Sequence, residues 1–244
     1  MTTVDVRRSA GRFRTRLSWL DSRHSFSFGR HYDPTNIRFG LLLASNHDVV
    51  AAGAGYDPHP HRGVEIVSWV LAGALEHEDD AGNRGVVRPG WVQRTSAGSG
   101  IVHSERAYGA EPVEFVQMWA VPDEAGTEPD HQQADVTDAL ASGGLVPVAS
   151  GIPRHRGSAA VRIRQRDAAL SAARLAGGEP VPLPVAAYLH LYVARGSVTL
   201  HGAGELGPTE LSRGDAARIT AADGQRLTAT GDAEILVWEM HREA

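Results

Sequence analysis

Short runs of β-forming residues, divided by glycine and proline over the whole length of the chain, restrict the possible folds more than any other feature. The 27 glycines and 13 prolines separate segments rich in Val, Ile, Leu and Thr. Four clear examples are residues 64–71, 114–121, 189–193 and 234–238. Such spacing is typical of an all-β sandwich or barrel and disfavours a helical protein.

A faint internal repeat suggests that this plan occurs twice. The segment VLAGAL at residues 70–75 resembles VARGSV at residues 193–198, and a second glycine turn follows each copy. The paired glycines are Gly73 with Gly90, 17 residues apart, and Gly196 with Gly214, 18 residues apart. A shared strand–turn–strand plan in both halves indicates two related antiparallel β-barrels in tandem.

The boundary between the two barrels is expected near residue 135. Residues 1–135 would form the first barrel and residues 136–244 the second. Residues 141–157 contain Gly, Ser and Pro with little hydrophobic pattern, so this segment is interpreted as the connection between the domains.

Residues 167–176 (DAALSAARLA) carry a conflicting local signal. A possible N-cap, an alanine-rich body and Gly177-Gly178 behind it all favour a helix. The tandem barrel plan requires a strand here, and tertiary pairing can override a weak local propensity. We therefore predict a strand over residues 167–175, with the two glycines in a hairpin turn.

Composition and charge exclude several classes of function. The chain has no cysteine, and all 24 of its basic residues are arginine, so thiolate ligands and lysine Schiff bases are excluded. A net charge of −5 argues against a nucleic-acid-binding surface. No segment approaches the roughly 20 apolar residues that a membrane helix needs. The N-terminal segment lacks the apolar stretch of a secretory signal, so a cytoplasmic location is expected.

Two short motifs provide a candidate metal site. Residues two apart in a strand point to the same face, so His59 and His61 can reach one point. His103 and Glu105 repeat this arrangement with a histidine and a carboxylate. Brought together across a barrel, the four side chains would offer three nitrogens and one oxygen to one divalent ion. Such a set suits Fe, Mn, Ni, Cu or Zn.

The other histidines lack a partner at ligand spacing and are interpreted as surface or core residues. They are His24, His31, His47, His131, His155, His190, His201 and His241. His77 lies in the acidic segment 76–80, just before an expected loop at residues 79–85. For His77 we favour a solvated loop end over a position beside or behind the metal ligands.

These motifs lie within a longer segment that resembles the pirin family, a branch of the cupin superfamily. The resemblance is carried by HPHRGVEIVSWVLAGALEHED and RPGWVQRTSAGSGIVHSE, and by WLDSRHSFSF and HYDP nearer the N-terminus. It extends over residues 19–122 and is thin beyond them. It implies a bicupin, an all-β protein of two antiparallel barrels, with a metal ion in the first barrel alone. Fe(II) is the ion expected first.

Carried over residue by residue, the metal ligands of the pirin family fall on His59, His61, His103 and Glu105. The wider cupin superfamily more often uses the glutamate of an HxHxxxE motif, which here is Glu65. Glu65 is expected on the same strand face as His61 and is the rival fourth ligand. The pirin pattern favours Glu105 and leaves Glu65 in a supporting role.

Bacterial pirin-like proteins resemble quercetinases, which open the ring of a flavonol with O2 and release carbon monoxide. A metal-bound flavonol must first lose its 3-hydroxyl proton, and Glu105 is the candidate general base. The resemblance therefore implies two small-molecule partners, a flavonol-like aromatic substrate and O2.

Other pirins are regulators, so the alternative is a non-enzymatic iron-binding protein that docks on a transcription or metabolic partner. Five N-terminal arginines could form a docking strip, although a solvated strand is the favoured interpretation. They are Arg7, Arg8, Arg12, Arg14 and Arg16.

The second barrel is predicted to be metal-free. When the glycine turns are aligned, the ligand positions of the first barrel correspond to Pro182, Pro184, Leu227 and Ala229. The side chains of proline, leucine and alanine have no atom that binds a metal ion.

Overall fold

Nearly all of the regular secondary structure in the described residues is β-strand. The computed structural model describes residues 1–204 and 207–244. Its strands form two seven-stranded and two four-stranded sheets, and only β13 and β14 (bounds below) pair in parallel among the described strands. The helical segments described are α1 (Thr137–Leu140) and 3-10 turns at Ser9–Gly11 and Pro153–His155. No helix in the described residues is long and apolar enough to cross a membrane.

The first barrel is a pair of sheets, as in a jelly roll. In spatial order its large sheet contains β12 (Asp130–Asp135), β9 (Trp91–Ser96), β6 (Glu65–Ala72), β11 (Val113–Ala120), β4 (Leu42–Val50), β3 (Leu20–His24) and β2 (Phe13–Arg16). Its small sheet contains β5 (Gly55–His61), β10 (Ile101–Ala107), β7 (Leu75–Asp79) and β8 (Arg84–Val87).

The second barrel repeats this plan. Its large sheet contains β1 (Thr3–Arg7), β20 (Ala216–Ala222), β17 (Ala186–Arg195), β22 (Ala233–Met240), β15 (Ala168–Leu175), β13 (Val146–Ser150) and β14 (Val161–Arg162). Its small sheet contains β16 (Val181–Pro182), β21 (Arg226–Ala229), β18 (Ser197–His201) and β19 (Thr209–Ser212). The predicted all-β fold of two tandem antiparallel barrels is confirmed.

Two details differ from the expected division of the chain. The first strand, β1, pairs with β20 and so belongs to the second barrel. We therefore retain the boundary between the two barrels at residue 135 as a proposal. Residues 3–7 are the exception, because they belong to the second barrel. Residues 141–157 are not a bare connection, because they include β13, which pairs with β15.

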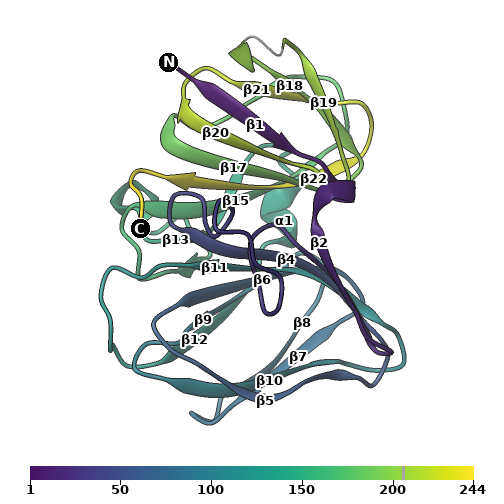
Figure 1. Cartoon of the computed structure of the whole chain (residues 1–244), viewed down its shortest axis with the longest axis vertical. Helices are drawn as coiled ribbons and strands as arrows, with labels where there is room; N and C mark the ends of the chain where they lie inside the picture. The colour runs from purple at the N-terminus through teal and green to yellow at the C-terminus, as the bar shows by residue number, and fades with distance from the viewer. Residues whose placement is uncertain (205–206) are drawn as a thin grey trace.

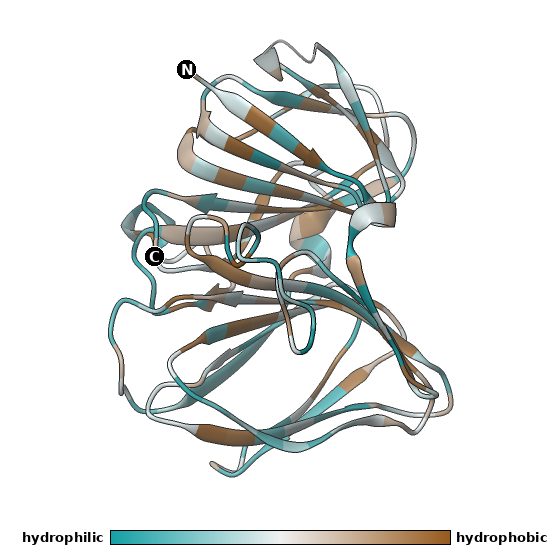
Figure 2. Ribbon diagram, in the orientation of Figure 1, coloured by the Kyte–Doolittle hydropathy of each residue, from teal (hydrophilic) through white to brown (hydrophobic). Residues whose placement is uncertain are grey.

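The two large sheets pack face to face at the centre of the molecule, and the small sheets lie at its opposite ends (Figure 1). The apolar cluster between the large sheets draws on both halves of the chain, including Trp69 and Met118 from the first and Leu170 and Trp238 from the second. A second apolar cluster fills the interior of the second barrel. Strands such as β6 and β22 are thus buried on both faces, which explains their largely apolar sequences. Figure 2 shows hydrophobic and hydrophilic residues alternating along β1, which lies at a sheet edge.

The internal repeat corresponds to equivalent glycine turns in the two barrels. Gly73 links β6 to β7, Gly196 links β17 to β18, and both have a φ of 70°. A Cβ atom at either position would lie 2.2 Å from a backbone carbonyl oxygen, that of Pro112 or of Asp232. Glycine alone fits such a turn without strain, which explains why the sequence repeat is clearest there.

The strand predicted over residues 167–175 is confirmed as β15. It pairs with β22 along its whole length and with β13 on its other edge, so ladder pairing overrides the helix propensity of its alanines. The hairpin predicted at Gly177 and Gly178 is wrong. Strand β16 pairs with β21, so the two glycines lead the chain from the large sheet to the small one.

The buried His190 of β17 is expected to make the protein sensitive to acid. Burial, and then the charge of Arg218, lowers the pKa of His190 to about 3, whereas the ordinary value is 6.5. The unfolded chain therefore takes up a proton before the folded protein does. Above pH 6.5 His190 is neutral in both states, and the free energy of unfolding keeps its full value. As the pH falls from 6.5 towards 3, only the unfolded chain takes up the proton, so the free energy of unfolding decreases progressively.

When the pH falls from 7 to 4, the free energy of unfolding of His190→Leu should decrease by about 3 kcal/mol less than that of the wild type, at about 1.4 kcal/mol per pKa unit. Urea titrations at several pH values measure this difference. The exposed His241 is the control, because His241→Leu should follow the wild-type pH dependence. An unchanged acid sensitivity in His190→Leu would contradict the prediction.

Candidate metal centre

Strands β5 and β10 bring the predicted metal-binding side chains together. They are antiparallel neighbours in the small sheet of the first barrel, and His103 is the register partner of His59. Buried and more exposed residues alternate along β10, so one of its faces is turned into the barrel. The buried residues of that face are Ile101, His103, Glu105 and Ala107. The alternation therefore places a histidine and a carboxylate between two apolar residues.

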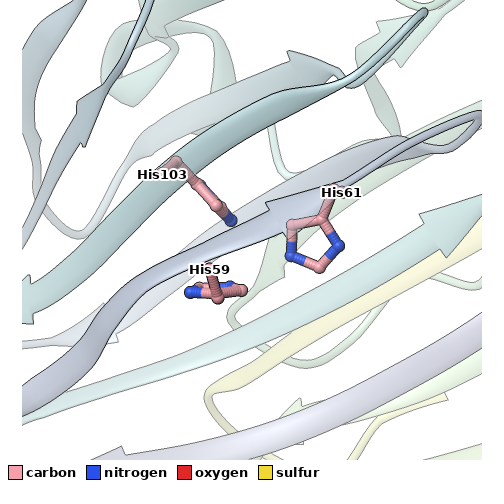
Figure 3. A group of neighbouring side chains, drawn as sticks. All are labelled: His59, His61 and His103. Atoms are coloured by element: carbon pink, nitrogen blue, oxygen red, sulfur yellow. The ribbon is translucent and has the colours of Figure 1, made fainter.

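The imidazole rings of the three predicted histidines project from these two strands and approach one another (Figure 3). The ring centroids of His59 and His61 are 4.8 Å apart, and that of His103 lies 4.6 Å from His59 and 4.9 Å from His61. One nitrogen of each ring lies within 4.8 Å of the other two. Three imidazole nitrogens at this separation can be directed to one ion.

The protonation of the three rings fits a metal centre. Nδ1 of His59 donates to the carbonyl oxygen of Asp57 at 2.8 Å, because a carbonyl oxygen can only accept, so Nε2 is the nitrogen of this ring that is available to an ion. Nε2 of His61 and Nε2 of His103 are buried and have no hydrogen-bond partner among the described residues. Burial, followed by the neighbouring His103 and His59, lowers the pKa of His61 to about 4. Neutral imidazoles with free lone pairs are the form that binds a divalent ion.

The carboxylate of Glu105 is buried beside these rings and is only 2% exposed. Its Oε2 accepts a hydrogen bond of 2.6 Å from Nε2 of Gln117. Its Oε1 accepts longer bonds, of 3.2 Å from Nε2 of Gln93 and 3.4 Å from Oγ of Ser68. Oε1 is therefore the less firmly held oxygen.

The two side-chain amides that donate to Glu105 are each oriented by a second hydrogen bond, which their own oxygen accepts. Nε1 of Trp119 donates to Oε1 of Gln117 at 3.1 Å, and Nε2 of Gln133 donates to Oε1 of Gln93 at 2.9 Å. An indole nitrogen can only donate, so the amide of Gln117 must direct its NH2 group at Glu105. These contacts keep a fixed set of donors around the carboxylate.

Glu105 adjoins part of the histidine cluster. An oxygen of its carboxylate lies within 4.8 Å of a ring nitrogen of His103 and of a ring nitrogen of His77. His59, His61 and His103 form a separate group of three nitrogens, so His103 belongs to both groups. Burial raises the pKa of Glu105, but His103, His77, the hydrogen bond from Gln117 and His59 together outweigh burial, so the pKa lies below its ordinary value. The structure thus joins the three predicted histidines and places the predicted carboxylate, in its ionised form, at the edge of their cluster.

The rival ligand Glu65 is engaged elsewhere, and the prediction that it shares a strand face with His61 is wrong. His61 ends β5 in the small sheet, and Glu65 begins β6 in the large sheet. Oε2 of Glu65 accepts hydrogen bonds from Oγ of Ser96, at 2.8 Å, and from the backbone N–H of Arg164, at 3.1 Å. Burial raises its pKa. Glu65 therefore joins the first barrel to a segment of the second.

Comparison with known proteins relates these residues to a family. The pirin family model matches residues 3–120, and the model of the quercetinase C-terminal cupin domain matches residues 148–240. A Mycobacterium tuberculosis protein, provisionally named quercetin 2,3-dioxygenase, is 53% identical over 240 residues, which cover 98% of this chain and 96% of the relative. The chain belongs to the pirin family.

Two further relatives agree with this assignment. The quercetin 2,3-dioxygenase of Escherichia coli is 32% identical to this pirin over 240 residues, covering 97% of this chain and 98% of the relative. The crystal structure of the bacterial pirin YhhW of E. coli in complex with nickel(II) gives a TM-score of 0.87 at 32% identity. That match covers 99% of this chain and 100% of the other. The predicted bicupin fold is thereby confirmed.

The pirin buries a second histidine cluster that the sequence analysis missed. His77 was predicted at a solvated loop end, but it is fully buried in β7. Its ring stacks on that of His131, with centroids 4.2 Å apart and planes 17° apart. The available signal was the alternation in LEHED, which buries Leu75, His77 and Asp79 on one face of β7.

Three other residues at the site were also missed. They are Gln117 on β11, Gln93 on β9 and Ser68 on β6, and each donates a hydrogen bond to the carboxylate of Glu105. Ser68 and Gln117 interrupt largely apolar strands, whereas Gln93 lies in β9 beside other polar residues that are also buried. A polar side chain at an inward position of such a strand requires a partner, and that requirement was the signal that could have identified them.

Four of the five N-terminal arginines are exposed at the surface, as the favoured interpretation of a solvated strand expected. These four contact carboxylates of this pirin, and the fifth, Arg12, is buried and donates to the hydroxyl of Tyr192 at 3.0 Å. The four pairs are Arg7 with Asp5, Arg8 with Asp215, and both Arg14 and Arg16 with Asp21.

Proposed function

We propose that this pirin is a metal-dependent dioxygenase of the quercetinase type, which opens the ring of a flavonol with O2. Its ligands would be His59, His61, His103 and Glu105, and its ion Fe(II), with Mn, Ni, Cu or Zn as alternatives. The observation that carries the proposal is the group of three histidines with free ring nitrogens beside a buried, ionised carboxylate. The name of the E. coli relative and the nickel(II) complex of YhhW support the reaction class and a divalent ion.

Glu105 would act as the general base as well as a ligand. When bound, the ion supplies a Lewis acid that acidifies the flavonol 3-hydroxyl and a redox centre for O2. The proton of that hydroxyl would move to Oε1 of Glu105, because Oε2 is already engaged by Gln117 at 2.6 Å. The longer bonds from Gln93 and Ser68 hold Oε1 less firmly and leave it able to form a new O–H bond.

An aromatic wall beside His61 fits a planar substrate. The indole of Trp119 meets the imidazole of His61 edge to face, with ring centroids 4.9 Å apart and planes 78° apart. Phe28 also packs edge to face against Trp119, with ring centroids 5.2 Å apart. Trp119 is partly exposed, so a flavonol ring placed beside His61 would contact its indole.

Replacing Trp119 should separate substrate binding from the chemical step. Trp119→Leu removes both the wall and the donor to Gln117, so it should raise KM for quercetin up to about tenfold, since such aromatic contacts are worth about 0.5–1.5 kcal/mol, and should also lower kcat. Trp119→Phe keeps a ring but loses the donor to Gln117, so it should lower kcat with little change in KM. Steady-state kinetics at equal metal content test this. A Trp119→Leu variant with the KM of the wild type would show that the indole of Trp119 does not contact the substrate.

We further propose that the metal ion binds in the first barrel alone. Strand β21 occupies the place in its small sheet that β10 occupies in the first barrel. Leu227 and Ala229 of β21 are buried in the apolar cluster of the second barrel, which supports this part of the proposal.

Oxygen uptake with quercetin tests the proposed activity. Metal-free protein is loaded separately with Fe(II), Mn, Ni, Cu or Zn, to about one equivalent per chain by metal analysis, and initial rates are compared. We expect uptake with Fe(II) and none without metal. Fully loaded protein that consumes no O2 with any ion would favour the alternative, a non-enzymatic iron-binding regulator that docks on a transcription or metabolic partner.

A further inference from the structure

A buried chain of side chains runs from Asp79 through His77 to His103. Nε2 of His77 lies 3.1 Å from Oδ2 of Asp79, and Nδ1 of His77 lies 3.3 Å from Nδ1 of His103. The register of β7 and β10 produces this arrangement, since Asp79 lies opposite His103 and His77 lies opposite Glu105. All of these side chains are buried, so water does not compete for the contacts.

The partners of Asp79 determine the direction of the hydrogen bonds. Its Oδ1 accepts from the backbone N–H groups of Ala81, at 3.1 Å, and Asn83, at 2.9 Å. Its Oδ2 accepts from Nδ2 of Asn83 at 3.0 Å. A carboxylate surrounded by donors accepts only, so Nε2 of His77 carries a proton and donates it to Oδ2. A neutral imidazole carries a single N–H, so in neutral His77 the other nitrogen, Nδ1, keeps its lone pair and is the acceptor.

His103 must supply the remaining proton of the chain. Because Nδ1 of His77 accepts, Nδ1 of His103 carries a proton and donates it. Nε2 of His103 therefore keeps its lone pair. This is the buried nitrogen that has no partner in the described part of the chain. His103 groups with His59 and His61 through one of its ring nitrogens, and Nε2 is the one that these contacts leave free for an ion.

His131 supports the ring of His77 and does not share a second ion with it. A nitrogen of each ring and an oxygen of Asp79 do lie within 4.8 Å of one another. The two rings are stacked with planes 17° apart, however, and a lone pair lies in the plane of its ring. Two nearly parallel rings cannot direct lone pairs at one ion. Both nitrogens of His77 are also engaged already.

We propose that Asp79 and His77 are positioning residues that fix the tautomer of His103, with its proton on Nδ1 and its Nε2 free for the ion. Neither residue needs to touch the ion or the substrate. The inference rests on the metal site of the proposed function and is independent of the flavonol reaction. Partners that orient a ligating imidazole in this way typically affect metal affinity by about 10–100-fold.

The Asp79→Asn variant tests the direction of the chain. Asparagine can preserve the turn, because its oxygen can accept from Ala81 and Asn83, but its NH2 group would then face His77. His77 would have to accept at Nε2 and carry its proton on Nδ1. His103 would in turn be forced to place its proton on Nε2. Nickel(II) affinity, measured by calorimetry, should fall about 10–100-fold.

Two variants serve as controls. Asp80→Asn makes the same change at the exposed neighbouring position, whose Oδ1 accepts from the backbone of Val102, and should bind nickel(II) like the wild type. His77→Gln retains an acceptor for His103 and a donor for Asp79, so its affinity should remain within about threefold of the wild type. Equal losses in Asp79→Asn and Asp80→Asn would overturn the proposal, as would His77→Gln binding as weakly as Asp79→Asn.

Nitrogen-15 NMR of the histidines gives a readout that needs neither metal nor a folded variant. Metal-free wild type should show His103 protonated on Nδ1 and His77 on Nε2, and folded Asp79→Asn should show the reverse. A proton on Nε2 of His103 in the wild type would overturn the proposal. Wild type with the expected tautomers that consumes no O2 with quercetin would instead refute the dioxygenase and support the positioning role.

Discussion

The His103→Ala variant is expected to lose nearly all turnover of quercetin and to bind nickel(II) at least about 100-fold more weakly than the wild type. His103 is one of only three histidines in the site cluster, and its ring lies within 5 Å of both others. Loss of a residue behind a ligating histidine costs about 10–100-fold in affinity, so loss of the ligand itself should cost more. Calorimetry and an oxygen electrode measure the two effects.

His201→Ala provides the matched control for His103→Ala. His201 lies in the second barrel, where its Nε2 contacts Oγ1 of Thr228, and it takes no part in the site. Its replacement should leave nickel(II) affinity and turnover unchanged. Circular dichroism establishes whether each variant is folded. A folded His103→Ala protein with wild-type affinity would remove His103 from the metal centre.

The Glu105→Gln variant, loaded until its iron content matches that of the wild type, is expected to turn over quercetin at least about tenfold more slowly. Glutamine is nearly isosteric but cannot take up the 3-hydroxyl proton. General-base assistance is typically worth about 10²–10⁴-fold, so a tenfold loss is a conservative expectation. Stopped-flow absorbance of bound quercetin separates proton removal from the later reaction with O2.

Two other outcomes for Glu105→Gln have distinct meanings. Turnover that falls only in step with iron loss would leave Glu105 as a ligand and nothing more. Full turnover in the loaded variant would retain the enzyme but remove Glu105 as the base. As a comparison, Glu65→Gln should keep wild-type iron affinity, because Glu65 contacts Ser96 and Arg164 and not the histidine cluster.

The fold and the core of the site could be predicted from sequence because both depend on local periodicity. His59 with His61, and His103 with Glu105, are two residues apart, and a strand turns such pairs to one face. The turns at Gly73 and Gly196 made the repeat visible in the sequence, because the backbone at both positions leaves no room for a Cβ atom. For β15, the repeated barrel plan correctly outweighed the helix propensity of its alanines.

The remainder depends on contacts between strands that are distant in sequence. Glu65 was misplaced because a turn intervenes between His61 and β6, so counting four residues did not preserve a face. His77 was misread because its acidic neighbours suggested solvent, while β10 and His131 cover it in the structure. Strand β1 could not be assigned to the second barrel, since nothing local indicates pairing with a strand more than 200 residues away.

Carbon monoxide in the headspace tests the central claim most directly, because its release requires cleavage of the flavonol ring and not merely oxidation of the substrate. Iron-loaded wild type is incubated with quercetin and O2 in a sealed vessel, beside metal-free protein and the His103→Ala variant. The account predicts about one carbon monoxide per quercetin and per O2 consumed, from the loaded wild type alone. Quercetin bleaching without carbon monoxide, or equal release from His103→Ala, would contradict it.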